Sequence, residues 1–139
     1  MSASSEVLTI GTFDVLHFGH VDFLRRCAEL GELVVGINSD RFVATFKDKP
    51  IMSEIERTYA VEQLGYETVL NKSSGRELIQ EQRPKILAVG SDWAEKDYLK
   101  QIDVTQGWLD GRGIILAYVP RTKWRPMSTT EIKRRIREN

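Results

Sequence analysis

The stretch Gly11-Thr-Phe-Asp-Val-Leu-His-Phe-Gly-His20 indicates most clearly how this chain folds and what it binds. It begins inside residues 7–13, a run rich in β-branched residues that is typical of a strand. It ends where residues 20–30 take up apolar positions at helical spacing. His17 and His20 stand three residues apart, so at the start of a helix they project to the same side. Because a helix N-terminus offers backbone N–H groups and partial positive charge, this corner is predicted to bind phosphate.

Glycines in the same stretch favour close contact between the backbone and a ligand. The sequence also argues against three common kinds of binding site. Gly11 and Gly19 have no Cβ, so the backbone can approach a ligand closely there. The chain has neither a Walker G-x-x-x-x-G-K-[ST] sequence nor a G-x-G-x-x-G after a strand, which argues against a P-loop or a dinucleotide site. Two histidines with only Asp14 nearby lack a third zinc ligand. Asp14 stays a candidate contact for a metal ion, without further protein ligands.

Outward from this stretch, the pattern predicts an α/β fold. Further strands are expected at residues 32–38, 67–70, 86–90 and 114–120, and helices at 53–64, 75–82 and from 128 onward. The helices at 53 and 128 begin with capping boxes, in which a Ser is followed three residues later by a Glu. Apolar strands that alternate with helices indicate a Rossmann-like, doubly wound parallel sheet. Ligands of such sheets bind beyond the carboxyl ends of the strands.

Length and composition fit one ordinary globular domain over residues 1–139. The chain is 41% hydrophobic and 29% charged, and its 20 basic and 20 acidic residues cancel. Zero net charge argues against binding to a nucleic-acid polymer or to a membrane surface. Cys27 is the only cysteine, which excludes a disulfide within the chain. The polar start and the lack of a long apolar run predict a cytoplasmic protein that does not enter a membrane.

The charge is nevertheless unevenly distributed along the chain. Residues 121–139 contain seven basic and two acidic residues, a net charge of +5, which leaves −5 on the first 120 residues. Such a block indicates either a solvated helix face or an anionic partner. For the last basic residues (Lys133, Arg134, Arg135 and Arg137) the solvated face is the expectation, with contacts to an acceptor or to a second copy as the alternative.

The opening stretch resembles the G-T-F-D-x-x-H-x-G-H signature of the cytidylyltransferase-like nucleotidyltransferases. From about residue 7 to residue 137 the chain resembles the glycerol-3-phosphate cytidylyltransferase family. The further matches are Lys47 and Lys49, Arg57, Gly90 to Trp93, Arg121-Thr122 and Ser128 to Thr130. The resemblance implies the H-x-G-H nucleotidyltransferase fold and the transfer of a nucleotidyl group from a nucleoside triphosphate with Mg²⁺. A small phosphorylated acceptor takes that group, and pyrophosphate leaves.

The resemblance also implies roles for individual residues. His17 and His20 stabilise the charge on the α-phosphate and on the leaving pyrophosphate, assisted by Arg121. Lys47 and Lys49 lie on a loop that closes over the triphosphate, and which of the two dominates stays open; a plain solvated loop is the alternative. The residues implied to bind the nucleotide are Gly11, Thr12, Phe13, Asp92, Arg121, Thr122, Ser128, Thr129 and Thr130. Capping of the last helix is a second use for the Ser-Thr-Thr sequence, compatible with the first.

Three further residues are implied to bind the acceptor. Arg57 would hold its phosphate, a role that suits a bidentate guanidinium; the alternative is an exposed helix arginine paired with Glu54 or Glu56. Asp40 would contact an acceptor hydroxyl or simply cap a helix. Trp93 would line the substrate site or pack in the core.

The nucleotide and the acceptor have two alternative assignments. The leading one is the transfer of CMP from CTP to a phosphorylated alcohol, because Arg-Thr before Ser-Thr-Thr and the Asp-Trp pair favour it. The sequence Val-Gly-Ile-Asn-Ser-Asp at residues 35–40 resembles an adenylyltransferase on a sugar phosphate, as in ADP-heptose synthesis, equally well. Five residues stand between Arg121-Thr122 and Ser128, where the family usually has three, so the acceptor's identity is open. A catalytically silent nucleotide-binding module is the third hypothesis.

The family also implies a homodimer. Residues 97–113 form an insertion-like segment, and its Trp108 is predicted to supply an apolar anchor for the interface.

Overall fold

Five parallel strands form one sheet with the order β3-β2-β1-β4-β5. The computed structural model describes residues 5–91, 97–120 and 129–138. The strands are β1 (Val7–Gly11), β2 (Leu33–Asn38), β3 (Glu67–Asn71), β4 (Ile86–Gly90) and β5 (Ile115–Val119). Because β1 has β2 on one side and β4 on the other, the strand order reverses beside β1, which is where such sheets bind ligands. The doubly wound α/β prediction is confirmed.

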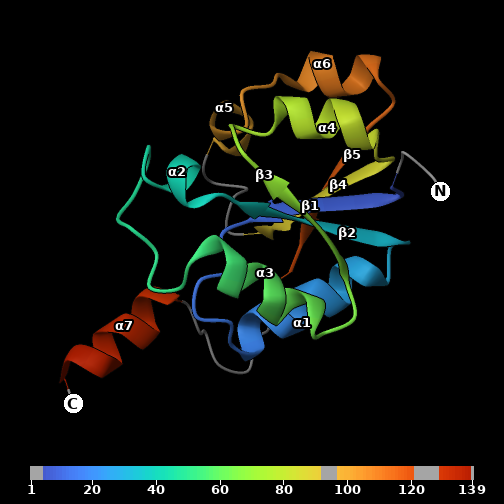
Figure 1. Cartoon of the computed structure of the whole chain (residues 1–139). Helices are drawn as coiled ribbons and strands as arrows, with labels where there is room; N and C mark the ends of the chain where they lie inside the picture. The colour runs from blue at the N-terminus through green and yellow to red at the C-terminus, as the bar shows by residue number, and fades with distance from the viewer. Residues whose placement is uncertain (1–4, 92–96, 121–128, 139) are drawn as a thin grey trace.

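Helices cover both faces of this sheet (Figure 1). In chain order they are α1 (Phe18–Ala28), α2 (Asp40–Val43), α3 (Glu54–Glu62), α4 (Arg76–Gln82), α5 (Tyr98–Gln101), α6 (Gln106–Gly111) and α7 (Thr129–Glu138). α1 and α3 lie against one face, and α4, α5 and α6 against the other. The capping box of α3 forms as predicted, since Ser53 and Glu56 exchange hydrogen bonds. Within the described residues, no helix is long and apolar enough to cross a membrane.

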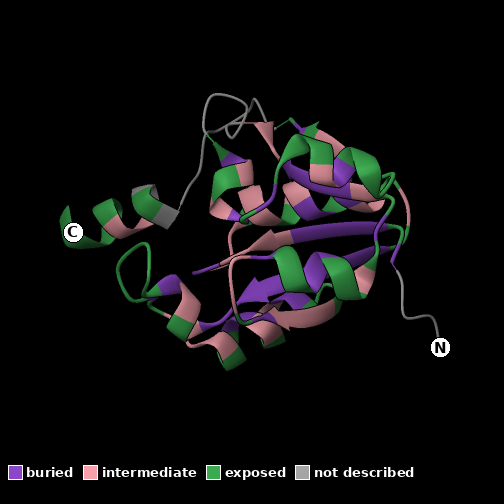
Figure 2. Ribbon diagram, turned by 90° about the horizontal axis from the view of Figure 1, so that it is seen from above, coloured by how far each residue is buried: buried purple, intermediate pink, exposed green. Residues whose placement is uncertain are grey.

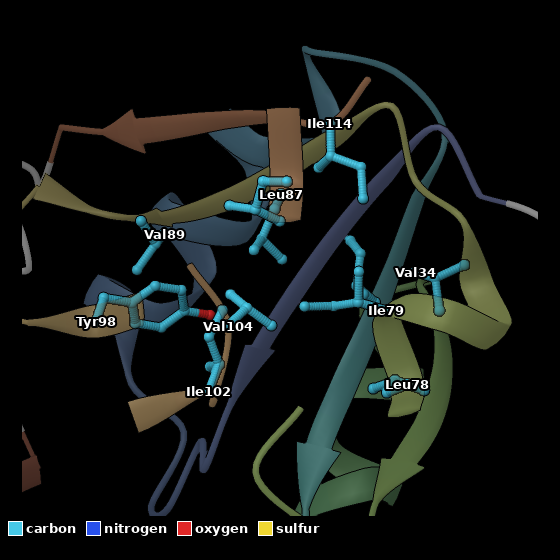
Figure 3. Packing of buried hydrophobic residues seen from close by; sticks show 11 residues of the cluster. Val34, Leu78, Ile79, Leu87, Val89, Tyr98, Ile102, Val104 and Ile114 are labelled. Carbon is cyan, nitrogen blue, oxygen red and sulfur yellow. The ribbon is translucent and has the colours of Figure 1, made fainter. Parts of the chain in front are cut away.

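Alternate residues of the central strands pack into two separate layers of core. In β1, the Val7 side chain joins the layer beneath α1 and α3, and the Leu8 side chain joins the layer beneath α4 to α6. Figure 3 shows the second layer, in which Leu87 and Val89 from β4 meet Tyr98 and neighbouring side chains. The purple strands in the middle of Figure 2 show that buried residues concentrate in the sheet. A sheet packed on both faces explains why a central strand such as β4 (ILAVG) has no polar side chain.

Local boundaries differ from the sequence predictions at the first strand, the first helix and the 97–113 segment. β1 ends at Gly11, because Phe13 has a φ of 55° and leaves the strand conformation. α1 begins at Phe18 and not at residue 20, since His17 caps it. Residues 97–113 form α5 and α6. There Trp108 is half-buried, with the Arg112 guanidinium 4.2 Å from its ring centroid, so Trp108 is engaged within its own chain.

Candidate functional site

The two histidines form one stacked pair at the start of α1, just beyond the carboxyl end of β1. Their ring centroids are 3.9 Å apart with an interplanar angle of 29°. His17 Nδ1 accepts from the Gly19 N–H at 3.0 Å, and His20 Nδ1 accepts from the His17 N–H at 3.2 Å. A neutral imidazole that accepts at Nδ1 carries its proton on Nε2. The backbone therefore sets both tautomers, and Nε2 is the donor nitrogen of each ring.

The loop between β1 and α1 is held in an unfavourable backbone conformation. Phe13 and Val15 have φ values of 55° and 51°, a left-handed region that costs a non-glycine residue roughly 1–3 kcal/mol. The Phe13 ring lies so close to Gly11 that a Cβ on Gly11 would stand 2.9 Å from it, and the same ring meets His20 edge-on at 5.6 Å. Strain of this size persists only where the surroundings fix the backbone, and the hydrogen bonds of Thr12 and Asp14, on either side of Phe13, do so.

A line of polar side chains joins the carboxyl ends of the three strands β3, β2 and β1. Asn71 Nδ2 donates to Asn38 Oδ1 at 3.0 Å, and Asn38 Nδ2 donates to Thr12 Oγ1 at 3.2 Å. Asn38 and Asn71 are buried and are the last residues of their strands. The line orients the Thr12 hydroxyl beside the histidine loop. Sequence reasoning missed both asparagines, although a polar residue that ends an apolar strand was a readable signal.

Arg57 lies inside the protein, with a fully buried side chain. Its Nη1 donates to the carbonyl oxygens of Thr12 at 2.7 Å and Asn38 at 2.8 Å, and its Nε donates to that of Met52 at 3.0 Å. Its Nη2 bonds Asp40 Oδ1 at 2.7 Å. The guanidinium therefore ties the ends of β1 and β2 to the segment before α3. It neither lies on the surface beside Glu54 or Glu56 nor presents an open fork to an acceptor phosphate, which corrects both expectations for it.

Asp40 belongs to the same network and does not cap α2. Ser39 is the N-cap, its hydroxyl accepting from the Phe42 N–H, and Asp40 is the first helical residue. The Asp40 N–H donates to Glu54 Oε1 at 2.9 Å, and the Glu54 N–H donates to Asp40 Oδ2 at 3.2 Å. The two helix starts α2 and α3 are thus clasped together. Asp40 keeps 40% of its side chain exposed, which leaves room for an acceptor hydroxyl, and that contact stays a prediction.

Asp14 connects three segments that are far apart in the sequence. Its carboxylate is buried and accepts from the N–H groups of Ile51 at 2.8 Å and Met52 at 2.9 Å. Lys133 Nζ, from α7, lies 3.5 Å from Asp14 Oδ2. Burial alone would raise the pKa of the Asp14 carboxyl, but the two backbone donors and the Lys133 ammonium outweigh burial and lower it. Asp14 therefore stays ionised and anchors the end of the lysine loop.

Lys47 and Lys49 occupy the loop that leads from α2 to α3, and both residues are exposed. The Lys47 ammonium lies 5.7 Å from the centroid of the Phe46 ring. Although the residue as a whole is exposed, the surrounding protein removes water from the Lys47 ammonium and so lowers the pKa of Lys47, and the positive charge of Lys133 lowers it further. An anionic ligand beside such an ammonium would stabilise its positive charge. A lowered pKa of this kind is typical of functional sites, so Lys47 is a candidate contact for an anion.

The remaining predicted site residues lie outside the described residues or at the start of α7. Those outside are Asp92, Trp93, Arg121, Thr122 and Ser128. Thr129 and Thr130 begin α7, and Thr130 is exposed. Lys133, a residue of the basic tail, contacts Asp14 in the site loops and is therefore not the purely solvated residue that the sequence suggested. Its position one helical turn beyond Thr129 and Thr130 was the available signal.

The described residues do not form a protein metal site. Among them, no group of three or more His, Cys, Asp or Glu side chains is arranged to hold an ion. The Asp14 carboxylate, the predicted candidate, is engaged by two backbone donors and by Lys133.

The strand order reverses beside β1, and the paired histidines lie at the helix start that follows this strand, which is a position suited to phosphate. Comparison with known proteins gives the family. The model of the cytidylyltransferase-like family matches residues 8–135, and the chain belongs to this family.

Several curated relatives that match this chain carry the name bifunctional protein HldE. The one from a Nitratiruptor species is 39% identical over 97 residues, which cover 66% of this chain and 21% of that protein. The one from Campylobacter curvus is 34% identical over 117 residues, which cover 76% of this chain and 25% of that protein. The match thus spans about a quarter or less of either relative's length.

Solved structures agree on the fold. The lipopolysaccharide core biosynthesis protein of Thermoplasma volcanium superimposes with a TM-score of 0.68 at 26% identity, over 86% of this chain and 97% of that one. The pantothenate synthetase of Thermus thermophilus superimposes with a TM-score of 0.55 over 96% of this chain and 66% of that one. At 17% identity, the second match bears on the fold alone.

Proposed function

We propose that this protein transfers an adenylyl group from ATP to a sugar phosphate and releases pyrophosphate. The observation that carries nucleotidyl transfer is the stacked His17–His20 pair, whose tautomers the backbone sets, at the switch point of the sheet. For the nucleotide and the acceptor, the support comes from the relatives. The HldE proteins and the lipopolysaccharide core biosynthesis protein favour the ADP-heptose type of reaction over the transfer of CMP to a phosphorylated alcohol.

The reaction needs positioning and charge stabilisation and no general base. The acceptor phosphate is already anionic near neutral pH, so one of its oxygens attacks the α-phosphorus directly. A new P–O bond forms in line with the bond to the β-phosphate, which breaks, and the electron pair leaves with pyrophosphate. Donors at Nε2 of His17 and His20 meet the charge that accumulates on the α-phosphate oxygens. Mg²⁺, arriving with the triphosphate, would offset part of the charge on the phosphate oxygens.

Other residues of the site hold the substrates or the loops. Backbone groups of Gly11, Thr12 and Phe13 line the nucleotide, and Lys47 with Lys49 approaches the triphosphate from the loop before α3. Arg57 acts as a positioning residue, because its guanidinium holds the Thr12 carbonyl and not a ligand. For the residues outside the described ranges, the roles given above stay predictions; these are Asp92, Trp93, Arg121, Thr122 and Ser128.

A grid of substrates tests the proposal directly. ATP, CTP, GTP and UTP are each combined with sugar phosphates, including heptose phosphates, and with phosphorylated alcohols, and the release of pyrophosphate is measured with Mg²⁺. We expect turnover with ATP and a sugar phosphate, and none above background for the His20→Ala variant. Turnover with CTP and glycerol 3-phosphate would instead establish the cytidylyl assignment. If no combination turns over while the wild-type protein binds ATP, the protein is a nucleotide-binding module.

A further inference from the structure

One exposed side of α3 carries a band of large apolar residues. Ile51, Ile55 and Tyr59 are spaced four residues apart, and 58%, 78% and 63% of their surfaces are exposed. Ile51 precedes the helix, and Ile55 and Tyr59 share one side of it, since positions four apart are neighbours on a helix surface. Two large and mostly exposed apolar side chains that are neighbours on one helix, with a third just before the helix, favour an interaction surface.

The surroundings of this band are acidic. α3 contains Glu54, Glu56 and Glu62 and only one basic residue, Arg57. Because the Arg57 side chain is fully buried, it contributes nothing to the surface of the helix. An apolar band flanked by glutamates favours a partner that is itself apolar along one line and basic beside it.

α7 has this complementary character. Ile132 and Ile136 are four residues apart, and Ile136 is 62% exposed. Four basic residues of the same helix flank them, namely Lys133, Arg134, Arg135 and Arg137. Figure 1 shows α7 beginning beside the segment that leads into α3 and then running away from the sheet and its covering helices, and Figure 2 shows most of its residues exposed.

We propose that the Ile51–Ile55–Tyr59 band of one chain binds α7 of a second copy, and that the two copies exchange this contact. Within one chain the two surfaces do not cover each other, because Ile55 and Ile136 are both largely exposed in the same structure. Lys133 also fixes α7 to Asp14 of its own chain, so α7 is presented outward. In a dimer with two-fold symmetry, the band of each chain contacts α7 of the other, so both apolar surfaces of both chains are covered. This dimer does not depend on the proposed reaction.

The mass of the protein in solution provides the first test. Light scattering across a concentration series should give twice the 15.9 kDa of one chain for the wild-type protein. Ile55→Asp and Ile136→Asp should each weaken dimerisation about tenfold or more, because a charge would enter the apolar contact. Ile115→Asp is the matched control: Ile115 is 64% exposed but lies on β5, at the opposite edge of the sheet from β3, and should leave the dimer intact. A monomeric wild-type protein, or a dimer broken by Ile115→Asp alone, overturns the proposal.

Cross-linking then identifies which surfaces meet. Ile55→Cys and Ile136→Cys chains are prepared separately, mixed and oxidised; the natural Cys27 is buried, and burial raises the pKa of its thiol to about 12, so it does not react. The proposal expects a disulfide-linked dimer from the mixture and little from either chain alone. Efficient cross-linking of Ile55→Cys chains to each other would show an α3–α3 interface and overturn the assignment to α7.

Discussion

Replacing Arg57 with Met should lower the free energy of unfolding by more than the removal of any other charged side chain near the site. Three buried or half-buried carbonyl oxygens, those of Thr12, Asn38 and Met52, lose their donor at once. An unsatisfied acceptor costs about 1–3 kcal/mol when fully buried, and less where water can enter. The Asp40 contact adds little, because that carboxylate is 40% exposed and can be rehydrated. The sum is roughly 3 kcal/mol, at the lower end of what breaking a buried charge pair costs.

Urea unfolding measures this loss. With an m-value of about 2 kcal/mol/M, the midpoint of Arg57→Met should fall by roughly 1.5 M. Arg57→Lys should lose less, because an ammonium still provides three donors, though it cannot reach all four partners. Arg41→Met, an exposed arginine on the adjacent α2, serves as the control and should change the free energy of unfolding by less than about 0.5 kcal/mol.

A loss of less than about 1 kcal/mol for Arg57→Met would contradict this role, because water or a shifted backbone would then be satisfying the three carbonyls. A kinetic measurement separates this role from direct substrate binding. A positioning residue acts through the Thr12 segment, so Arg57→Lys should retain part of kcat and raise KM for the nucleotide. A phosphate ligand would instead raise KM for the acceptor alone.

Three further predictions concern the same region. His17→Ala and His20→Ala should each lower kcat by about 10²-fold or more with an unchanged circular-dichroism spectrum, and a loss below about tenfold would contradict charge stabilisation by the imidazoles. The folded pKa of Asp14 lies below its unfolded value, so its carboxylate stabilises the fold above about pH 4 and this contribution disappears as the pH falls through the folded pKa. Asp14→Asn should therefore be less stable at pH 7 and show a shallower loss of stability in acid by urea unfolding, whereas pH profiles parallel to the wild type would refute the role. Asn38→Ala breaks two side-chain hydrogen bonds and should cost roughly 1–3 kcal/mol in thermal unfolding, and a smaller cost would show that water replaces the amide.

The sequence predicts the sheet well because most of its strands are short runs rich in apolar residues, and such runs can be recognised without knowledge of distant contacts. Its errors have physical causes. α2 has only four residues, too few for a hydrophobic period to show, and its start is fixed by the exchange between Asp40 and Glu54, which are 14 residues apart. The first helix begins early because His17 itself acts as the cap, and histidine is not among the usual capping residues.

The site residues likewise divide into those whose geometry is local, which could be predicted, and those whose partners are distant in the sequence, which could not. His17 and His20 could be predicted because their geometry is local, set by the helix start that they occupy. The partners of Arg57 could not be predicted, since the Thr12 carbonyl stands 45 residues away and only the parallel pairing of β1 and β2 brings it close. The family resemblance assigned a phosphate-binding role to Arg57 because an arginine stands at that position. The sequence looks the same whether the guanidinium is buried or binds a phosphate. Burial, which a single sequence does not reveal, separates the two.

The strained loop gives a reason for this arrangement of charges. Phe13 and Val15 hold left-handed φ values, and a loop under such strain relaxes unless both of its sides are fixed. Arg57 fixes the Thr12 carbonyl on one side of Phe13, and Asp14 fixes the loop to the Ile51 and Met52 backbone on the other. The two buried charges therefore keep the histidine pair in place, so that the imidazoles need no reorganisation when a phosphate arrives. It follows that loosening either anchor should reduce kcat more than it reduces the affinity for a non-hydrolysable triphosphate, which binds without reaching the transition state.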